Sequence, residues 1–202
     1  MASQGLVHGA LSADAVHLCV DMQGLFAPGG PWAVAWMDKI LPAVCEIAGR
    51  HADRTIFTRF VPVNEPRDAV GMWRRYYQKW EDVTLARLGQ PDLVDLMPAL
   101  RRFVPPATVI DKRVYSPWTE GRLDALLGSS STALVITGGE TDVCVLATVL
   151  GAVDRGFRVV LVEDAICSSA DQTHDALMTL YRSRFSEQIE LVSAQQLLEA
   201  WR

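Results

Sequence analysis

Short hydrophobic runs alternate along this chain with longer segments of helical periodicity. Six runs have the length and composition of buried strands, and they cover residues 16–20, 55–58, 108–110, 133–137, 157–162 and 189–192. Five segments between and after them have the spacing or the end signals of helices, at residues 38–50, 123–127, 143–153, 171–184 and 194–201. Strands that alternate with helices in this way predict an α/β fold.

Several of the predicted strands are hydrophobic at successive positions instead of at every second position. This pattern indicates burial on both faces, as in a parallel sheet that helices cover on both sides. We therefore predict one domain over residues 1–202, a three-layer α/β/α structure with a mostly parallel sheet of about six strands. The chemistry of such sheets collects beyond the carboxyl ends of the strands.

Charge and composition narrow the class of partner. The formal net charge is −5, and no dense run of Lys or Arg offers a nucleic-acid surface. No hydrophobic stretch approaches the length of a membrane span, and no Lys or Arg precedes Lys39, so no signal-peptide pattern is recognisable. The four cysteines lack CxxC spacing, which favours a reduced, cytoplasmic setting. We expect a small-molecule substrate, and neither nucleic acid nor a membrane as partner.

Cys144 has the local context of a reactive thiol. It follows the strand-like run 133–137 through Gly138-Gly139, and a hydrophobic, helix-like segment begins beside it. In a first helical turn, unpaired N–H groups favour the thiolate and can bind an oxyanion, and Thr141 or Asp142 is suited to cap the helix. The alternative is that Cys144 is a buried packing residue, as we interpret the other cysteines, Cys19, Cys45 and Cys167.

Two other strand ends carry groups that a cysteine nucleophile needs. Asp21 ends the first predicted strand and Lys112 ends the third, so both are expected at the same sheet edge as Cys144. Asp21 can take the thiol proton and return it to a leaving group. Lys112 can hold that carboxylate and stabilise developing negative charge. Taken singly, Asp21 is also compatible with a mere strand end, and Lys112 with a surface charge.

The chain resembles the isochorismatase-like cysteine hydrolases, a superfamily that includes nicotinamidases and N-carbamoylsarcosine amidohydrolases. The segments that carry the resemblance are 20–23 with Phe26, 111–116, 138–145 with Thr148, 156–157 and 163–165. The resemblance implies a catalytic triad of Asp21, Lys112 and Cys144. It also implies a cis peptide bond between Gly139 and Glu140, an oxyanion hole made by the backbone amides of Glu140 and Cys144, and a homodimer or homotetramer.

One departure from the family pattern concerns metal. Nicotinamidases hold a divalent metal with an Asp and two His that follow the second strand, but residues 58–66 of this chain contain no histidine. The four histidines, at His8, His17, His51 and His174, are scattered along the sequence. We therefore expect no metal and no cofactor.

Aromatic residues that follow the relevant strands are candidates for the substrate pocket. The predicted set is Phe26, Trp73, Tyr77, Tyr115 and Trp118, with Tyr76 and Trp80 as further candidates. The residues between 73 and 80 also have helical spacing, which fits packing or oligomer contacts equally well. Arginines that are suited to bind a substrate carboxylate are Arg59, Arg74, Arg75 and Arg113.

The sequence thus predicts a metal-independent cysteine hydrolase that cleaves a C–N bond of a small amide or ureide through a thioester. One alternative is an isochorismatase-type hydrolase of a vinyl ether, which by the family resemblance needs the Asp but no thiol. Another is a non-catalytic binding or interaction protein on the same fold. A thiol redox enzyme is disfavoured because Cys144 has no CxxC partner, and a dinucleotide-binding enzyme because Gly138-Gly139 belongs to no GxGxxG turn.

Overall fold

The computed structural model describes residues 5–129 and 132–201. Its centre is a sheet of six parallel strands in the order β3-β2-β1-β4-β5-β6. The strands are β1 (Val16–Val20), β2 (Thr55–Phe60), β3 (Thr108–Lys112), β4 (Ala133–Gly139), β5 (Arg158–Cys167) and β6 (Ile189–Val192). The predicted α/β class and parallel sheet are confirmed, and all six strands lie where the hydrophobic runs placed them.

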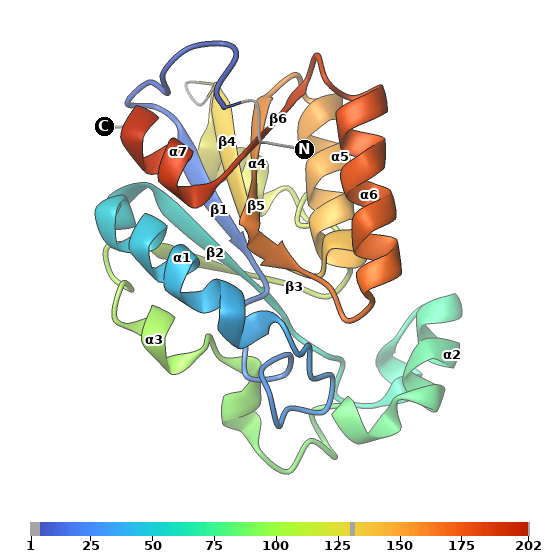
Figure 1. The fold of residues 1–202 in the computed structure, drawn as a ribbon. Coiled ribbons are helices and arrows are strands. Elements are labelled where there is room, and N and C mark those ends of the chain that lie inside the picture. The colour runs from blue at the N-terminus through green and yellow to red at the C-terminus, as the bar shows by residue number, and fades with distance from the viewer. Residues whose placement is uncertain (1–4, 130–131, 202) are drawn as a thin grey trace.

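Helices cover the sheet on both sides. They are α1 (Met37–Arg50), α2 (Met72–Lys79), α3 (Pro98–Arg101), α4 (Arg122–Leu127), α5 (Leu146–Asp154), α6 (Asp171–Arg184) and α7 (Ala194–Ala200). One hydrophobic core lies under α1 and α7, and a second lies under α4, α5 and α6 (Figure 1). No helix within the described ranges is long and hydrophobic enough to cross a bilayer.

The two cores explain the uninterrupted hydrophobic runs. Successive residues of a strand point to opposite faces of the sheet. In β1, Cys19 packs into the core under α1, whereas Leu18 and Val20 pack into the core under α5 and α6. All three side chains are fully buried, because neither face of the strand meets water.

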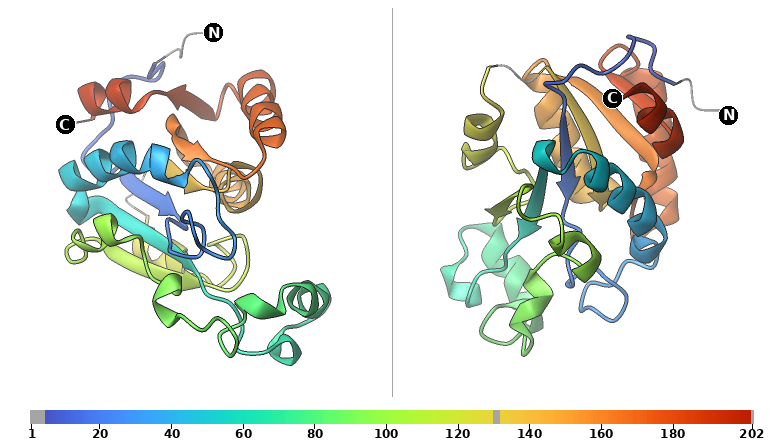
Figure 2. Two further views of the ribbon diagram at one scale, coloured as in Figure 1. Left: turned by 60° about the horizontal axis from the view of Figure 1, so that its bottom comes forward. Right: turned by 90° about the vertical axis from the view of Figure 1, so that its left-hand side faces the viewer.

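Two regions differ from the sequence prediction. Strand β5 continues five residues beyond the predicted end at residue 162, through an irregularity in which Ile136 pairs with Leu161 but Gly138 pairs with Ile166. The segment 60–106, between β2 and β3, contains α2, α3 and short 3-10 turns. Its part around α2 projects beyond the sheet and its covering helices (Figure 2).

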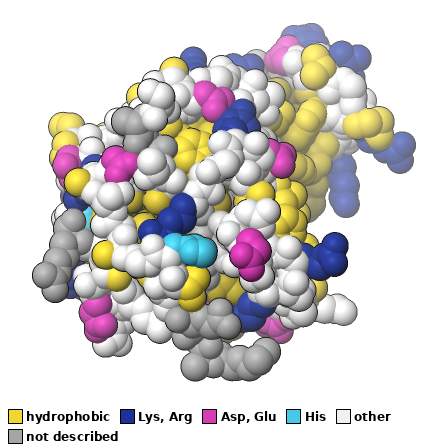
Figure 3. All heavy atoms as spheres, turned by 90° about the horizontal axis from the view of Figure 1, so that it is seen from above, with side chains coloured by type: hydrophobic (Ala, Val, Ile, Leu, Met, Phe, Trp, Pro, Cys, Tyr) yellow, Lys and Arg dark blue, Asp and Glu magenta, His cyan; other side chains and the backbone are white. Residues whose placement is uncertain are grey.

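Seen from above, the molecule carries Lys and Arg side chains scattered among acidic and hydrophobic ones (Figure 3).

Candidate active site

Asp21 and Lys112 form a buried ion pair at the carboxyl edge of the sheet. Lys112 Nζ lies 2.6 Å from Asp21 Oδ2, and the two side chains are 3% and 1% exposed. Strand β2 separates β1 from β3, and its Thr58 completes the arrangement. The Thr58 hydroxyl donates to Asp21 Oδ1 over 2.6 Å and accepts the Asp21 backbone N–H over 3.1 Å. Asp21 has a φ of 50°, a left-handed conformation that aspartate tolerates better than most residues.

Lys112 keeps its positive charge although it is buried. Burial disfavours the ammonium, but the negative charges of Asp21 and of ionised Cys144 outweigh that effect and raise the pKa of Lys112. Its ammonium also donates to the Val114 carbonyl over 3.2 Å and lies 5.2 Å from the centre of the Phe60 ring. The site therefore holds a fixed cation next to its carboxylate.

Cys144 lies in a π-helical turn, Thr141–Val145, that leads from β4 into α5. The residue is 5% exposed, and its thiol lies close enough to Asp21 and Lys112 for both to shift its pKa. Burial and the charge of Asp21 raise the pKa of the thiol well above its usual value, and Lys112 only partly opposes them. The helical position was expected to favour the thiolate, whereas burial and the Asp21 carboxylate favour the protonated thiol. The resting group is a thiol with a base beside it.

The π-helical turn is held by α6 instead of by its own caps. Neither Thr141 nor Asp142 caps the turn, contrary to the prediction. The Thr141 hydroxyl lies 2.9 Å from His174 Nδ1. Asp142 accepts hydrogen bonds of 2.5 Å from the hydroxyls of Ser168 and Thr173. The segment that carries the nucleophile is thus tied to the beginning of α6.

The link between β4 and the turn has the geometry that the resemblance implied. The peptide bond between Gly139 and Glu140 is cis, which confirms that prediction. Gly138 has a φ of 104°, and a Cβ there would overlap the backbone of Val20 on the neighbouring strand. The Glu140 carboxylate accepts the Ser169 backbone N–H over 2.7 Å.

A cavity of about 460 Å³ opens over Cys144. Its walls come from the β1–α1 connection, the end of β2, α2, the β3–α4 connection and the π-helical turn. The lining residues are Phe26, Pro31, Trp32, Ala33, Phe60, Tyr76, Trp80, Tyr115, Glu140, Val143, Cys144 and Ser169. The predicted residues Phe26 and Tyr115 are among them. Trp32 was not singled out from the sequence, although its position after the Gly-Gly-Pro turn of residues 29–31 marks a loop beyond the first strand.

Comparisons with known proteins identify the family. The sequence matches the Isochorismatase domain over residues 15–192. The chain belongs to the isochorismatase family. No curated protein gives a significant match to the sequence. The assignment makes the chain an isochorismatase-like hydrolase, without naming its substrate.

Solved structures of the family share this fold. A cysteine hydrolase from Pseudomonas syringae pv. phaseolicola 1448A is 21% identical, with a TM-score of 0.76 and 93% of each chain covered. An N-carbamoylsarcosine amidase from Thermoplasma acidophilum is 16% identical, with a TM-score of 0.70 and coverage of 89% of this chain and 96% of that one. A pyrazinamidase of Pyrococcus horikoshii in complex with zinc is 24% identical, with a TM-score of 0.64 and coverage of 89% and 99%.

The residues of this family member do not fit the metal that its nicotinamidase relatives are expected to hold. Near the end of β2, Arg59 donates to both carboxylate oxygens of Asp111, over 2.7 and 3.1 Å, and to Asp95 over 3.0 Å. Those acids are therefore committed to a guanidinium. Within residues 5–129 and 132–201, no three His, Cys, Asp or Glu side chains are grouped as metal ligands. The arginine candidates Arg59, Arg74, Arg75 and Arg113 are also outside the described lining of the cavity.

Three predicted pocket residues lie outside the cavity lining that the structure describes. Tyr77 is 1% exposed and packs in the core under α1. Trp73 packs edge-on against Tyr115, with 4.8 Å between ring centres, so it supports a wall from behind. Trp118 lies under α5 and donates its indole N–H to the Thr148 carbonyl over 3.0 Å. Their hydrophobic character fits packing as well as a pocket, so the sequence did not separate the two roles.

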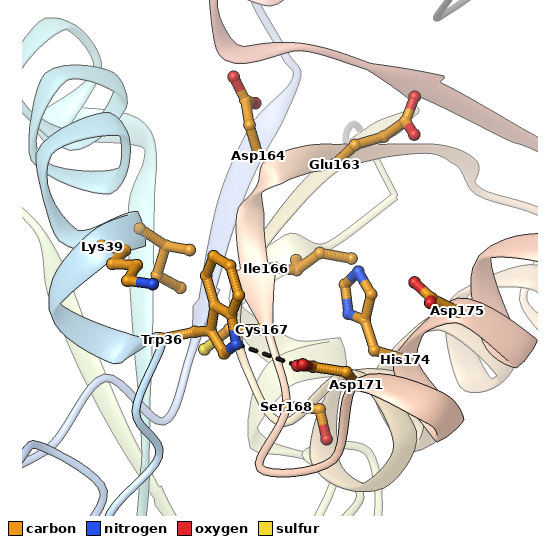
Figure 4. A pocket seen from close by; sticks show the side chains of 11 residues that line it. Trp36, Lys39, Glu163, Asp164, Ile166, Cys167, Ser168, Asp171, His174 and Asp175 are labelled. Carbon is orange, nitrogen blue, oxygen red and sulfur yellow. Dashed lines mark hydrogen bonds between the residues drawn. The ribbon is translucent and has the colours of Figure 1, made fainter. Parts of the chain in front are cut away.

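A second cavity, of about 470 Å³, lies between the beginning of α1 and the beginning of α6 (Figure 4). Trp36 and Lys39 face α6 across it, and the Trp36 indole donates to Asp171 over 3.0 Å. Four acidic side chains line it, and three have partners in the protein. Asp171 accepts from Trp36, Asp164 accepts the Ala194 backbone N–H, and Glu163 pairs with Arg182. These partners tie α1, α6 and α7 to β5.

Proposed function

We propose that this isochorismatase-family protein is a metal-independent cysteine hydrolase that cleaves a C–N bond of a small amide or ureide. One observation carries the proposal: the Cys144 thiol lies close to a carboxylate and an ammonium, which shift its pKa and are themselves 2.6 Å apart. These groups supply a nucleophile, a base and a fixed positive charge, and Cys144 lines a cavity that fits a small molecule.

The raised pKa of Cys144 defines the first step. The sulfur carries its proton at neutral pH, so attack requires Asp21 to remove that proton as the sulfur reaches the substrate carbonyl carbon. The carbonyl oxygen then becomes an oxyanion, for which we assign the backbone N–H groups of Glu140 and Cys144 as donors. Lys112 holds the carboxylate oriented through its ion pair and stabilises the negative charge that develops.

The second step releases the nitrogen product. Asp21 returns its proton to the leaving nitrogen, the C–N bond breaks, and ammonia or an amine departs from a Cys144 thioester. A water molecule then gives a proton to Asp21 and attacks the thioester carbonyl. The C–S bond breaks, the acid product leaves, and the proton passes from Asp21 to Cys144, which restores the thiol.

Ammonia release from a panel of small carboxamides and ureides tests this function. Wild type, Cys144→Ala and Asp21→Asn are compared with every compound. We expect release by wild type alone. Equal rates from the three proteins would refute the mechanism, and hydrolysis of vinyl ethers that depends on Asp21 but persists in Cys144→Ala would support the isochorismatase-type alternative.

A further inference from the structure

Few charged side chains line the cavity over Cys144. Of its described lining residues, Glu140 is the only one with a formally charged side chain. The Lys112 ammonium lies outside the described lining and is already paired with Asp21. No arginine or lysine is among the described lining residues, so an anionic substrate would meet the Glu140 carboxylate and no unpaired cation there.

Aromatic rings make up half of the described lining, and they surround Trp32 from several directions. Phe26 stacks on Trp32 with 17° between the planes, whereas Phe60 and Trp80 meet it edge-on at 64° and 78°. Tyr76 packs against it at 49°. The Trp32 indole nitrogen is buried, so the cavity meets the carbon atoms of that ring. Together with Tyr115, these rings give the cavity a wall of aromatic surface, called the cage below, and aromatic surfaces of this kind bind organic cations.

The negative charge of Glu140 acts on aromatic side chains that line the cavity. Burial raises the pKa values of Tyr76 and Tyr115, and the negative charge of Glu140 contributes to raising them. Two of the rings already lie near lysine ammoniums outside the lining, Phe60 at 5.2 Å from Lys112 and Trp80 at 5.4 Å from Lys79. Lys79 is exposed, so water and salt screen its charge more than that of the half-buried Glu140.

From this cage and its carboxylate, we propose that the substrate is an amide or ureide whose non-reacting end is a compact organic cation, such as a substituted ammonium. The inference rests on the proposed hydrolase function and adds the substrate class to it. Trp80 and Glu140 are the specificity-determining side chains: the ring binds the cation through its face, and the carboxylate supplies the opposite charge. The same arrangement rejects substrates that carry a carboxylate.

Three carboxamides with tetrahedral end groups of similar size test the proposal. They are trimethylammonioacetamide, 3,3-dimethylbutanamide and sulfoacetamide, which differ mainly in having a positive, zero or negative charge. Dissociation constants are measured by tryptophan fluorescence with Cys144→Ala, in which no thioester forms, so the intrinsic reactivity of each amide does not enter. We expect the cation to bind about five- to thirtyfold more tightly than the neutral amide, and the anion to bind most weakly.

Matched variants, each combined with Cys144→Ala, assign the preference to the cage. Glu140→Gln and Trp80→Leu should each reduce the ratio of neutral to cationic dissociation constants. Asp175→Asn and Trp36→Leu remove the same groups from the second cavity and should leave the ratio unchanged. Equal binding of cation and neutral amide, no binding of any compound, or a ratio that neither cage variant changes would overturn the proposal.

Turnover separates this inference from the function on which it rests. Cys144-dependent ammonia release from 3,3-dimethylbutanamide, without any preference for the cation, would keep the hydrolase and reject the substrate class. The predicted binding order without ammonia release from any of the three amides would support the cation site and count against the hydrolase.

Discussion

Two cavities of nearly equal volume, about 460 and 470 Å³, lie on either side of the connection from β5 to α6. Ser169 lines the catalytic cavity and Ser168 lines the second one. Each cavity also contains a buried cysteine, Cys144 in the first and Cys167 in the second. Size and burial therefore do not distinguish the two cavities.

The neighbours of the two thiols do distinguish them. Burial, with a contribution from the charge of Glu140, raises the pKa of Cys167 to about 12. The pKa of Cys144 is also raised, but Asp21 and Lys112 both lie close to it. A buried thiol becomes a nucleophile only where a base can take its proton. The predictions below test that difference, beginning with the largest effect.

Replacing the two cysteines in turn gives the sharpest contrast. Cys144→Ala should lower kcat by about 10⁴-fold or more, because no other group can form the thioester. Cys167→Ala should stay within about threefold of wild type, since it removes only packing atoms beside the site. Steady-state ammonia release measures both variants. A comparable loss in Cys167→Ala would remove the distinction between the two thiols.

Replacing Asp21 and replacing Lys112 should shift the pH dependence of Cys144 alkylation in opposite directions. Asp21→Asn removes the charge that raises the thiol pKa, so alkylation by iodoacetamide should extend to lower pH. The same variant should lose about 10²- to 10⁴-fold in kcat, because it lacks the base. Lys112→Met removes the group that lowers the pKa, so its alkylation should require higher pH. The rate of alkylation as a function of pH checks both signs, and a shift in the same direction for both variants would contradict the assigned roles.

Two glycines with positive φ separate backbone strain from close packing. Gly138, beside the catalytic cavity, has no room for a Cβ next to Val20, whereas Gly156 has open space around it. Gly138→Ala should therefore reduce the free energy of unfolding by about 3 kcal/mol or prevent folding. Gly156→Ala should cost about 1 kcal/mol, from its left-handed backbone alone. Denaturant unfolding measures both, and equal losses would show that the approach of β1 and β4 is unimportant.

The smallest expected effect tests how the second cavity supports the first. His174→Ala removes the contact with Thr141 and should reduce the free energy of unfolding by about 1 kcal/mol. The rate of ammonia release should fall modestly with it, as the π-helical turn is held less firmly. Asp175→Asn, one residue along α6, should change neither quantity. An unchanged His174→Ala protein would mean that the turn is held without α6.

The sequence predicted those features that depend on hydrophobic pattern and order along the chain. Parallel strands end at one edge, so the meeting of Asp21 and Lys112 followed from the topology alone. The contribution of Thr58 was not predicted, because a threonine inside a strand looks like any β-branched strand residue. The pKa direction of Cys144 was also missed, since it depends on a balance between burial and charge that only three-dimensional contacts determine.

The pocket was less predictable than the triad. Trp73, Tyr76 and Tyr77 lie on one short helix, and Trp80 directly follows it; of these four, only Tyr76 and Trp80 line the cavity. Helical spacing places residues on a face, but it does not say whether that face meets a core or a cavity. Trp32 sits in an irregular loop without periodicity, so nothing in the pattern marked it as the ring around which the others pack.

The most direct test of the central claim is to trap the acyl group during turnover. Wild-type protein is mixed with an amide that it hydrolyses, quenched in acid, digested and mapped by mass spectrometry, with Cys144→Ala and Cys167→Ala treated in parallel. We predict an acyl adduct, labile to hydroxylamine, on the peptide that contains Cys144 in wild type and in Cys167→Ala, and none in Cys144→Ala. An adduct on another residue, or hydrolysis by Cys144→Ala at the wild-type rate, would contradict the account.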